Sequence, residues 1–158
     1  IFPSFTVLEN CRLSAQAQHQ QAWSFWRNAE ADATTRTIAH EVATRVGLGD
    51  ALDRQAGFLS HGQKRQLEIA MCLATSPQVL LLDEPLAGMG AEETERMLTL
   101  LQELKQDHAI LLAEHDMDAV FRIADLITVM VNGVVIATGS PDDVRNNPDV
   151  RSAYLGDH

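Results

Sequence analysis

The stretch Val79-Leu80-Leu81-Leu82-Asp83-Glu84-Pro85 decides the fold of this chain. Its run of four aliphatic residues predicts a β-strand that is buried on both faces, as strands of parallel sheets are. Two acids follow directly, at the carboxyl end of the strand, where open α/β sheets place their active sites. Asp83 could bind Mg²⁺, usually through water, and Glu84 could orient or deprotonate a water molecule. Taken alone, the two acids could equally mark the point where a strand reaches solvent.

A second aliphatic run, Ile110–Ala113, predicts another buried strand, and an amphipathic helix from about Ala91 separates the two strands. Glu114-His115-Asp116 follows this second run. An imidazole at a strand end could contact a transferred phosphate or hold a water molecule. A lone histidine is more often a surface residue or part of a helix cap, so His115 alone does not establish a site.

The polar stretch Leu59-Ser60-His61-Gly62-Gln63 predicts the beginning of a helix, with Ser60 as its N-cap. A helix N-terminus presents unpaired backbone N–H groups and the positive end of the helix dipole, so it attracts anions. Gly62 would let a phosphate approach the backbone closely. An ordinary capped helix is the commoner explanation of such a stretch.

The order of elements predicts an α/β fold. Residues 1–76 read as mostly helical, with Thr6 and Glu9 as a capping box and Gly47 as a helix stop. Residues 77–158 alternate strands and helices and include a hairpin around Asn132-Gly133, followed by a helix that begins near Pro141. Parallel central strands follow from this alternation. Within the helical part, Ile38, Val42 and Val46 recur at every fourth position and are expected on one helical face.

Composition narrows the classes of function. The 158 residues include 12 basic and 22 acidic side chains, a formal net charge of -10, which disfavours a general nucleic-acid surface. Cys11 and Cys72 lie far apart with no further cysteine, so reduced thiols are expected rather than a disulfide or zinc site. No apolar run has the length of a membrane-spanning helix, and the N-terminal residues lack the features of a signal peptide.

In order and spacing, these stretches resemble the nucleotide-binding subunits of ABC transporters. Leu59–Gln63 resembles the signature LSGGQ, with His61 in place of the central glycine, which we interpret as a tolerated variant. Val79–Asp83 resembles the Walker B strand, and Glu84 the catalytic glutamate that follows it. The remaining matches are the D-loop, at Ala87, Gly88, Met89 and Gly90, and the switch histidine, at His115.

The resemblance implies a fold and a set of roles. The fold would be an incomplete P-loop NTPase core of the ABC ATPase type, with parallel central strands, a C-terminal hairpin and a helical subdomain. Residues 1–76 would form the helical subdomain with the signature motif. Residues 77–158 would form the RecA-like core portion, with Walker B, the D-loop, the switch histidine and the C-terminal helix. Two subunits would enclose two ATP molecules, with Asp83 at Mg²⁺, Glu84 as general base and His115 at the γ-phosphate. The loop that serves the ATP of the partner subunit would consist of Ser60, His61, Gly62 and Gln63.

The chain departs from the family pattern in two places. Gly90 stands where the D-loop usually ends in aspartate or asparagine, which puts its contacts across the dimer in doubt. The sequence also contains no G-x-x-x-x-G-K-[ST] loop for the phosphates. We therefore expect a C-terminal portion of a longer ATPase that neither binds ATP tightly nor hydrolyses it alone. An uncovered apolar strand edge and face would favour self-association or strand exchange.

Finer details of the motifs resemble importers of branched-chain amino acids, and urea and short-amide importers are close competitors. The details are Leu86–Met89, Glu114–Phe121, Asn147–Arg151 and Tyr154–Gly156. The expected partners are a second ATPase subunit and transmembrane permease subunits, and no nucleic acid. The expected location is the cytoplasm, peripheral on the inner face of the plasma membrane.

Two other classes stay open. ABC-type ATPases of DNA repair or translation carry long coiled-coil insertions or a second cassette. The short interval between Ser60 and Asp83 leaves no room for a coiled coil, and the acidic net charge disfavours nucleic acid. A non-catalytic module that only docks on partners is the second alternative.

Overall fold

The structure, a computed structural model, describes residues 1–19 and 29–155 of the chain. By compactness it divides into two units, Ile1–Ala113 and Glu114–His158, which are described in turn. The predicted division into residues 1–76 and 77–158 stays a prediction, because compactness alone does not identify a subdomain.

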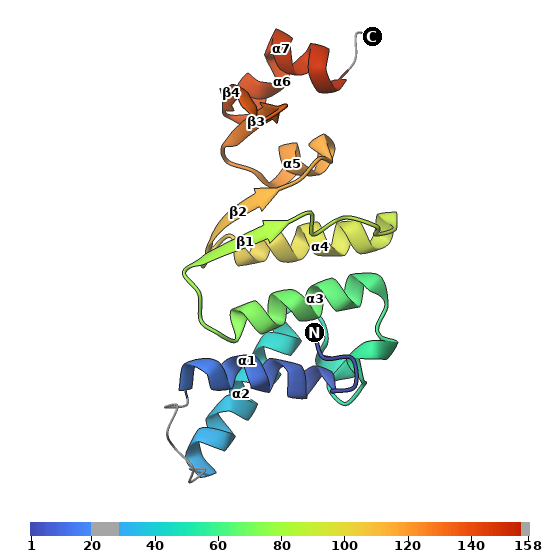
Figure 1. Ribbon diagram of the computed structural model, residues 1–158, viewed down its shortest axis with the longest axis vertical. Helices are drawn as coiled ribbons and strands as arrows, with labels where there is room; N and C mark the ends of the chain where they lie inside the picture. Colours follow the sequence, from blue (N-terminus) through green and yellow to red (C-terminus); the bar gives the residue numbers. More distant parts are fainter. Residues whose placement is uncertain (20–28, 156–158) are drawn as a thin grey trace. The chain divides into compact units, whose positions relative to one another are not determined.

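Three helices pack against one another in the first unit: α1 (Val7–His19), α2 (Ala29–Arg45) and α3 (His61–Leu73) (Figure 1). The capping box predicted for α1 is confirmed. The Thr6 backbone N–H donates to Glu9 Oε2 over 2.8 Å, and the Glu9 N–H donates to Thr6 Oγ1 over 3.1 Å. The Thr6 hydroxyl also donates to Glu9 Oε2 over 3.1 Å, and the hydrogen bonds that the carboxylate accepts from the Thr6 backbone and side chain lower the pKa of Glu9.

The helix α2 ends at Arg45, just before Gly47, the expected helix stop, whose φ of 83° is left-handed. The Leu48 N–H donates to the Ala43 carbonyl and the Gly47 N–H to the Thr44 carbonyl, which is the Schellman arrangement. The buried face of α2 differs from the expected one. Thr35, Ala39 and Ala43 lead to Val46 along the fully buried stripe, and the other two predicted residues are only half-buried beside it. Small alanines occupy the contact because they let the helices approach closely.

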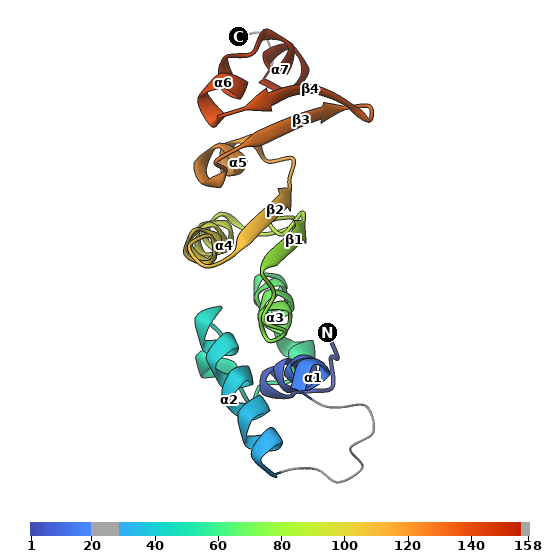
Figure 2. The same cartoon turned by 90° about the vertical axis from the view of Figure 1, so that its left-hand side faces the viewer.

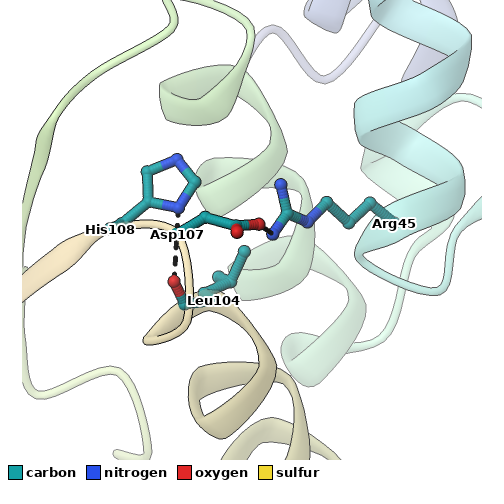
Figure 3. Close-up of polar contacts among 4 residues, drawn as sticks. All are labelled: Arg45, Leu104, Asp107 and His108. Atoms are coloured by element: carbon teal, nitrogen blue, oxygen red, sulfur yellow. Dashed lines mark hydrogen bonds and ion pairs between the residues drawn. The ribbon is translucent and has the colours of Figure 1, made fainter.

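Two short 3-10 turns, Gly49–Ala51 and Ala56–Phe58, lead from α2 to α3. An ion pair between Arg45, at the end of α2, and Asp107 joins α2 to the turn after α4 (Ala91–Leu104) (Figure 3). Beside it, the Nδ1 atom of His108 lies 3.3 Å from the Leu104 carbonyl oxygen. Both charged side chains of the ion pair are largely exposed, so it contributes little to stability.

The strands β1 (Val79–Asp83) and β2 (Ala109–Ala113) pair in parallel, with Val79 opposite Ala109 and Asp83 opposite Ala113. This confirms the predicted parallel central strands. The connection between them is α4, which runs beside the strands in Figure 1 and is seen nearly end-on at one side of them in Figure 2. On the inner side of α4, the buried residues are Met97, Leu98, Leu100, Leu101 and Leu104.

The expectation that β1 is buried on both faces is wrong. Leu80 is 3% exposed, whereas Val79 is 53% exposed, Leu81 73% and, on β2, Leu111 67%. Because side chains alternate between the faces of a strand, covering one face buries every second residue only. We call the exposed set Val79, Leu81 and Leu111 the open sheet face.

The second unit contains α5 (Met117–Ile123) and the antiparallel strands β3 (Ile127–Val131) and β4 (Val134–Gly139). The predicted hairpin is confirmed, because Asn132 and Gly133 have φ angles of 49° and 79°, as a type I′ turn requires. The predicted C-terminal helix is α6 (Pro141–Asn146), capped by Ser140 and followed by α7 (Pro148–Val150) and a π-helical turn (Arg151–Leu155). The hydrophobic core of the second unit is the cluster Ile127, Val129, Val144 and Val150.

Neighbouring leucines of β1 provide a test of this burial. We expect Leu80→Ala to lower the free energy of unfolding by about 2–5 kcal/mol, because it leaves a cavity under the sheet. The matched variant Leu81→Ala, on the open sheet face, should cost less than about 1 kcal/mol. Chemical denaturation followed by circular dichroism measures both, and equal losses would contradict the one-sided sheet.

The open sheet face also predicts self-association of the chain. Leu81→Lys and Leu111→Lys should each shift the chain toward monomer in sedimentation velocity runs across a concentration series, because a lysine disfavours apolar contact and edge pairing. Leu126→Lys, at a leucine of the second unit that is also 67% exposed, is the matched control. A chain that is monomeric at every concentration before substitution would refute the prediction.

Candidate functional site

The acid pair stands where the sequence places it, at the carboxyl end of the parallel strands. Asp83 is the last residue of β1 and pairs with Ala113, the last residue of β2. The Glu84 N–H continues the ladder by donating to the Ala113 carbonyl oxygen over 2.9 Å. Both carboxylates are on exposed residues. The strand pairing therefore places two consecutive acidic residues at the edge of the sheet where both strands end.

Glu84 has a feature that the sequence does not reveal. Its φ is 44°, in the left-handed region, where an L-residue with a side chain costs about 1–2 kcal/mol. Such positions persist where the surroundings enforce them, and they cluster at functional sites. The turn that follows is closed by the Ala87 N–H, which donates to the Glu84 carbonyl oxygen over 3.2 Å. The chain thus turns sharply at Glu84 and leads into Ala87–Gly90.

Ser60 is the N-cap of α3, as predicted, and it forms a full capping box. Ser60 Oγ accepts the Gln63 N–H over 3.2 Å, and Gln63 Oε1 accepts the Ser60 N–H over 3.1 Å. The Gln63 side chain therefore serves the cap in this structure. The first turn of α3 keeps the dipole and N–H groups that favour an anion.

The Ser60 hydroxyl has a second partner that the sequence did not suggest. It donates to Glu93 Oε1, at the beginning of α4, over 3.0 Å. A methyl group added at Gly62 would lie 2.9 Å from both Cδ and Oε1 of the same glutamate. A side chain at Gly62 would therefore force the end of the Glu93 side chain to shift, and glycine lets the carboxylate approach the backbone of α3. Because Glu93 lies 33 residues after Ser60, no local sequence pattern could predict this contact.

His61 connects the same loop to the segment after the acid pair. Its ring Nε2 lies 3.0 Å from the Ala87 carbonyl oxygen, and because a carbonyl only accepts, Nε2 carries the proton. Gly88 has a left-handed φ of 73°, and a side chain there would begin 3.4 Å from the same ring nitrogen. The loop Ser60–Gln63 and the segment Ala87–Gly90 are therefore in direct contact within the first unit.

Gly90, the departure from the family pattern, is the N-cap of α4 and makes no hydrogen bond from a side chain. A Cβ atom there would meet nothing within 4 Å. An aspartate or asparagine would fit this position and would cap the helix. The beginning of α4 is held instead by the contact of Glu93 with α3.

A cleft of about 290 Å³ lies beside the loop. Its walls include Ser60, Gly62 and Gln63 from the beginning of α3, and Met89, Glu93 and Arg96 from the region of α4. The cleft therefore combines an anion-attracting helix end with one acidic and one basic side chain.

His115 belongs to the second unit, where it follows the strand end by two residues. Its side chain is 70% exposed, and its Nδ1 lies 3.8 Å from Oε2 of Glu114, whose side chain is 1% exposed. Asp116 caps α5 by accepting the Ala119 N–H over 3.1 Å. The approach of His115 to the acid pair stays a prediction.

Among the described residues, no group of three histidine, cysteine or acidic side chains could hold a metal ion. Asp83 nevertheless suits Mg²⁺, which proteins often bind through one or two carboxylates, with waters and phosphate oxygens as the other ligands. The thiols are poor nucleophiles. Burial raises the pKa of Cys11 to about 12, and burial together with Glu68 raises the pKa of Cys72. Within residues 1–19 and 29–155, no helix combines the length and the hydrophobicity needed to span a bilayer.

Comparison with known proteins agrees with this arrangement. A family model described as "ABC transporter" matches residues 1–87, and one described as "Branched-chain amino acid ATP-binding cassette transporter" matches residues 134–158. The chain is 41% identical over 169 aligned residues to the high-affinity branched-chain amino acid transport ATP-binding protein LivG of Salmonella typhimurium. It is 40% identical over 167 residues to the corresponding protein BraF of Pseudomonas aeruginosa. Both alignments cover 99% of the chain and 64% of the relative, so the chain spans less than two thirds of the length of these relatives.

Solved structures show the same fold. The ADP conformation of MJ1267, an ATP-binding cassette of an ABC transporter, matches with a TM-score of 0.79 and 28% identity over 99% of the chain and 65% of that structure. A nucleotide-free ATP-binding cassette from an ABC transporter also matches, with a TM-score of 0.79 and 28% identity. The predicted ABC ATPase fold is thereby confirmed. With a family model that covers more than half of its residues, the chain belongs to the ABC transporter family.

Proposed function

We propose that these residues are part of the ATP-hydrolysing subunit of an ABC importer for branched-chain amino acids. The observation that carries the proposal is the parallel strand pair that ends in Asp83 and Glu84, in the same unit as the capped helix at Ser60. Phosphoryl transfer depends mainly on positioning and charge stabilisation, and these features supply an acid pair and an anion-attracting helix end.

Asp83 and Glu84 would act on the same ATP molecule. A Mg²⁺ ion bound at Asp83 would neutralise charge on the phosphates during transfer. Glu84 would orient or deprotonate the attacking water, because its carboxylate follows the strand end directly. The left-handed backbone of Glu84 supports this assignment, since strain of this kind is retained where geometry matters. His115 would contact the γ-phosphate.

The loop Ser60–Gln63 would serve the ATP of a partner ATPase subunit. The backbone N–H groups of His61 and Gly62, which the capping box does not use, and the Ser60 hydroxyl are suited to phosphate oxygens. His61 is proposed as part of this nucleotide-binding loop, and its hydrogen bond to the Ala87 carbonyl would join the loop to the D-loop. Ala87, Gly88, Met89 and Gly90 would form that D-loop and lie near the boundary between the two subunits.

The names of the relatives support the choice of solute and partners. LivG and BraF are both named as high-affinity branched-chain amino acid transport proteins, and the match at residues 134–158 is to a family model of the same description. The partners would be a second ATPase subunit and transmembrane permeases, which would place the protein on the cytoplasmic face of the membrane. ATP and Mg²⁺ would be its substrate and metal.

Glu84→Gln tests the proposed catalysis in the complete transporter that contains these residues. We expect ATP hydrolysis and leucine uptake to fall at least about 100-fold, because glutamine cannot accept the proton of water. The control Glu92→Gln removes a carboxylate that is 84% exposed and should retain activity. An unchanged rate in Glu84→Gln would remove Glu84 from this role, and uptake of urea without leucine would favour the alternative solute.

Residues 1–158 alone should not bind MgATP with micromolar affinity, because they contain no G-x-x-x-x-G-K-[ST] loop to hold the phosphates. Isothermal titration calorimetry of the purified chain measures this, and circular dichroism confirms that the sample is folded. Micromolar binding would overturn the prediction.

A further inference from the structure

The Ser60 hydroxyl has only one proton to donate, and in this structure the proton is already in use. Its oxygen accepts the Gln63 N–H as part of the helix cap. Its O–H lies 3.0 Å from Glu93 Oε1, and a carboxylate accepts only, so the hydroxyl is the donor. Hydrogen bonds of this charge-assisted kind are about twice as strong as neutral ones.

The carboxylate of Glu93 is also packed against the first turn of α3. A methyl group at Gly62 would come within 2.9 Å of its Cδ and Oε1, so the absence of a side chain at Gly62 is what makes the approach feasible. The first turn of this 13-residue helix is the place where backbone N–H groups and the helix dipole favour a negative charge. A negative group of the chain itself therefore lies where a phosphate would be favoured.

We propose that Glu93 is a positioning residue that occupies the phosphate position at Ser60 and is displaced when nucleotide binds there. This inference rests on the proposed function, in which Ser60 serves the ATP of a partner subunit. Carboxylate and phosphate are both negative and both need the single hydroxyl proton, so they exclude each other from Ser60. Nucleotide binding at this loop then includes the cost of releasing Glu93.

The structure offers the displaced carboxylate another partner. Arg96 follows three residues later on α4, a spacing at which helical side chains meet, and it lines the same cleft as Glu93 and Ser60. Arg96 Nη1 now lies 3.2 Å from Glu92 Oε1, so the guanidinium is already held near the beginning of α4. A rotation of the Glu93 side chain away from α3 would bring it toward this positive charge and free Ser60.

The test is Glu93→Gln in the complete protein that contains these residues. Glutamine has the same shape and keeps an oxygen that accepts from Ser60, but it lacks the charge. We expect the KM for MgATP, and the Kd of a non-hydrolysable ATP analogue measured by competition, each to fall about fivefold. Glu103→Gln removes the same charge from an exposed position near the other end of α4, and it should change neither value by more than about twofold.

A double-variant cycle separates this inference from the proposed function. Ser60→Ala should weaken binding of the analogue, and Glu93→Gln should have a smaller effect in that background, because the hydrogen bond at Ser60 is gone and only the repulsion between carboxylate and phosphate remains. If Ser60→Ala leaves binding and hydrolysis unchanged, the proposed function of the loop fails. If Ser60→Ala weakens binding but Glu93→Gln changes affinity no more than Glu103→Gln does, only the role of Glu93 fails. Thermal unfolding of each variant checks that the loss of the cap has not unfolded α3.

Discussion

The in-register parallel pairing of β1 with β2 is the constraint on which the rest of the first unit depends. It places Asp83 opposite Ala113, and the ladder extends by one more hydrogen bond to the Glu84 N–H. Parallel strands need a crossover, and α4 supplies it while covering one face of the pair. Because both strands end at the same edge, everything that follows them begins there, including the turn into Ala87–Gly90.

That turn brings two distant segments into contact. His61 reaches the Ala87 carbonyl and Ser60 reaches Glu93, so the beginning of α3 is held by two polar contacts to residues that follow the acid pair. In the proposed function, the acid pair and the Ser60 loop serve different ATP molecules. Direct contacts between the Ser60 loop and the segment after Glu84 offer a physical route by which occupancy of one site could affect the other. The contacts are polar and partly exposed, which suits groups that exchange partners more than groups that hold the core together.

Much of the local structure could be predicted from the sequence because the signals are short-range. The capping boxes at Thr6 and Ser60, the stop at Gly47 and the turn at Asn132-Gly133 each depend on residues within a few positions of one another. The acid pair was also predictable, since an aliphatic run that ends in two carboxylates marks a strand end. The family followed from the order of such motifs, and the match of residues 1–87 to the family model confirms it.

The burial of individual side chains and the contacts between distant residues could not be predicted from the sequence, because they depend on what covers each surface in three dimensions. The aliphatic run of β1 predicts burial on both faces, yet only Leu80 is fully covered, and Leu81 beside it faces solvent. On α2, a four-residue spacing fits more than one face, and packing selects the one with small alanines. Composition and local pattern thus establish the strands, the helix caps and the family. The left-handed Glu84, the bond of His61 to Ala87 and the carboxylate of Glu93 on Gly62 arise from packing between segments far apart in the chain, for which no local pattern carries a signal.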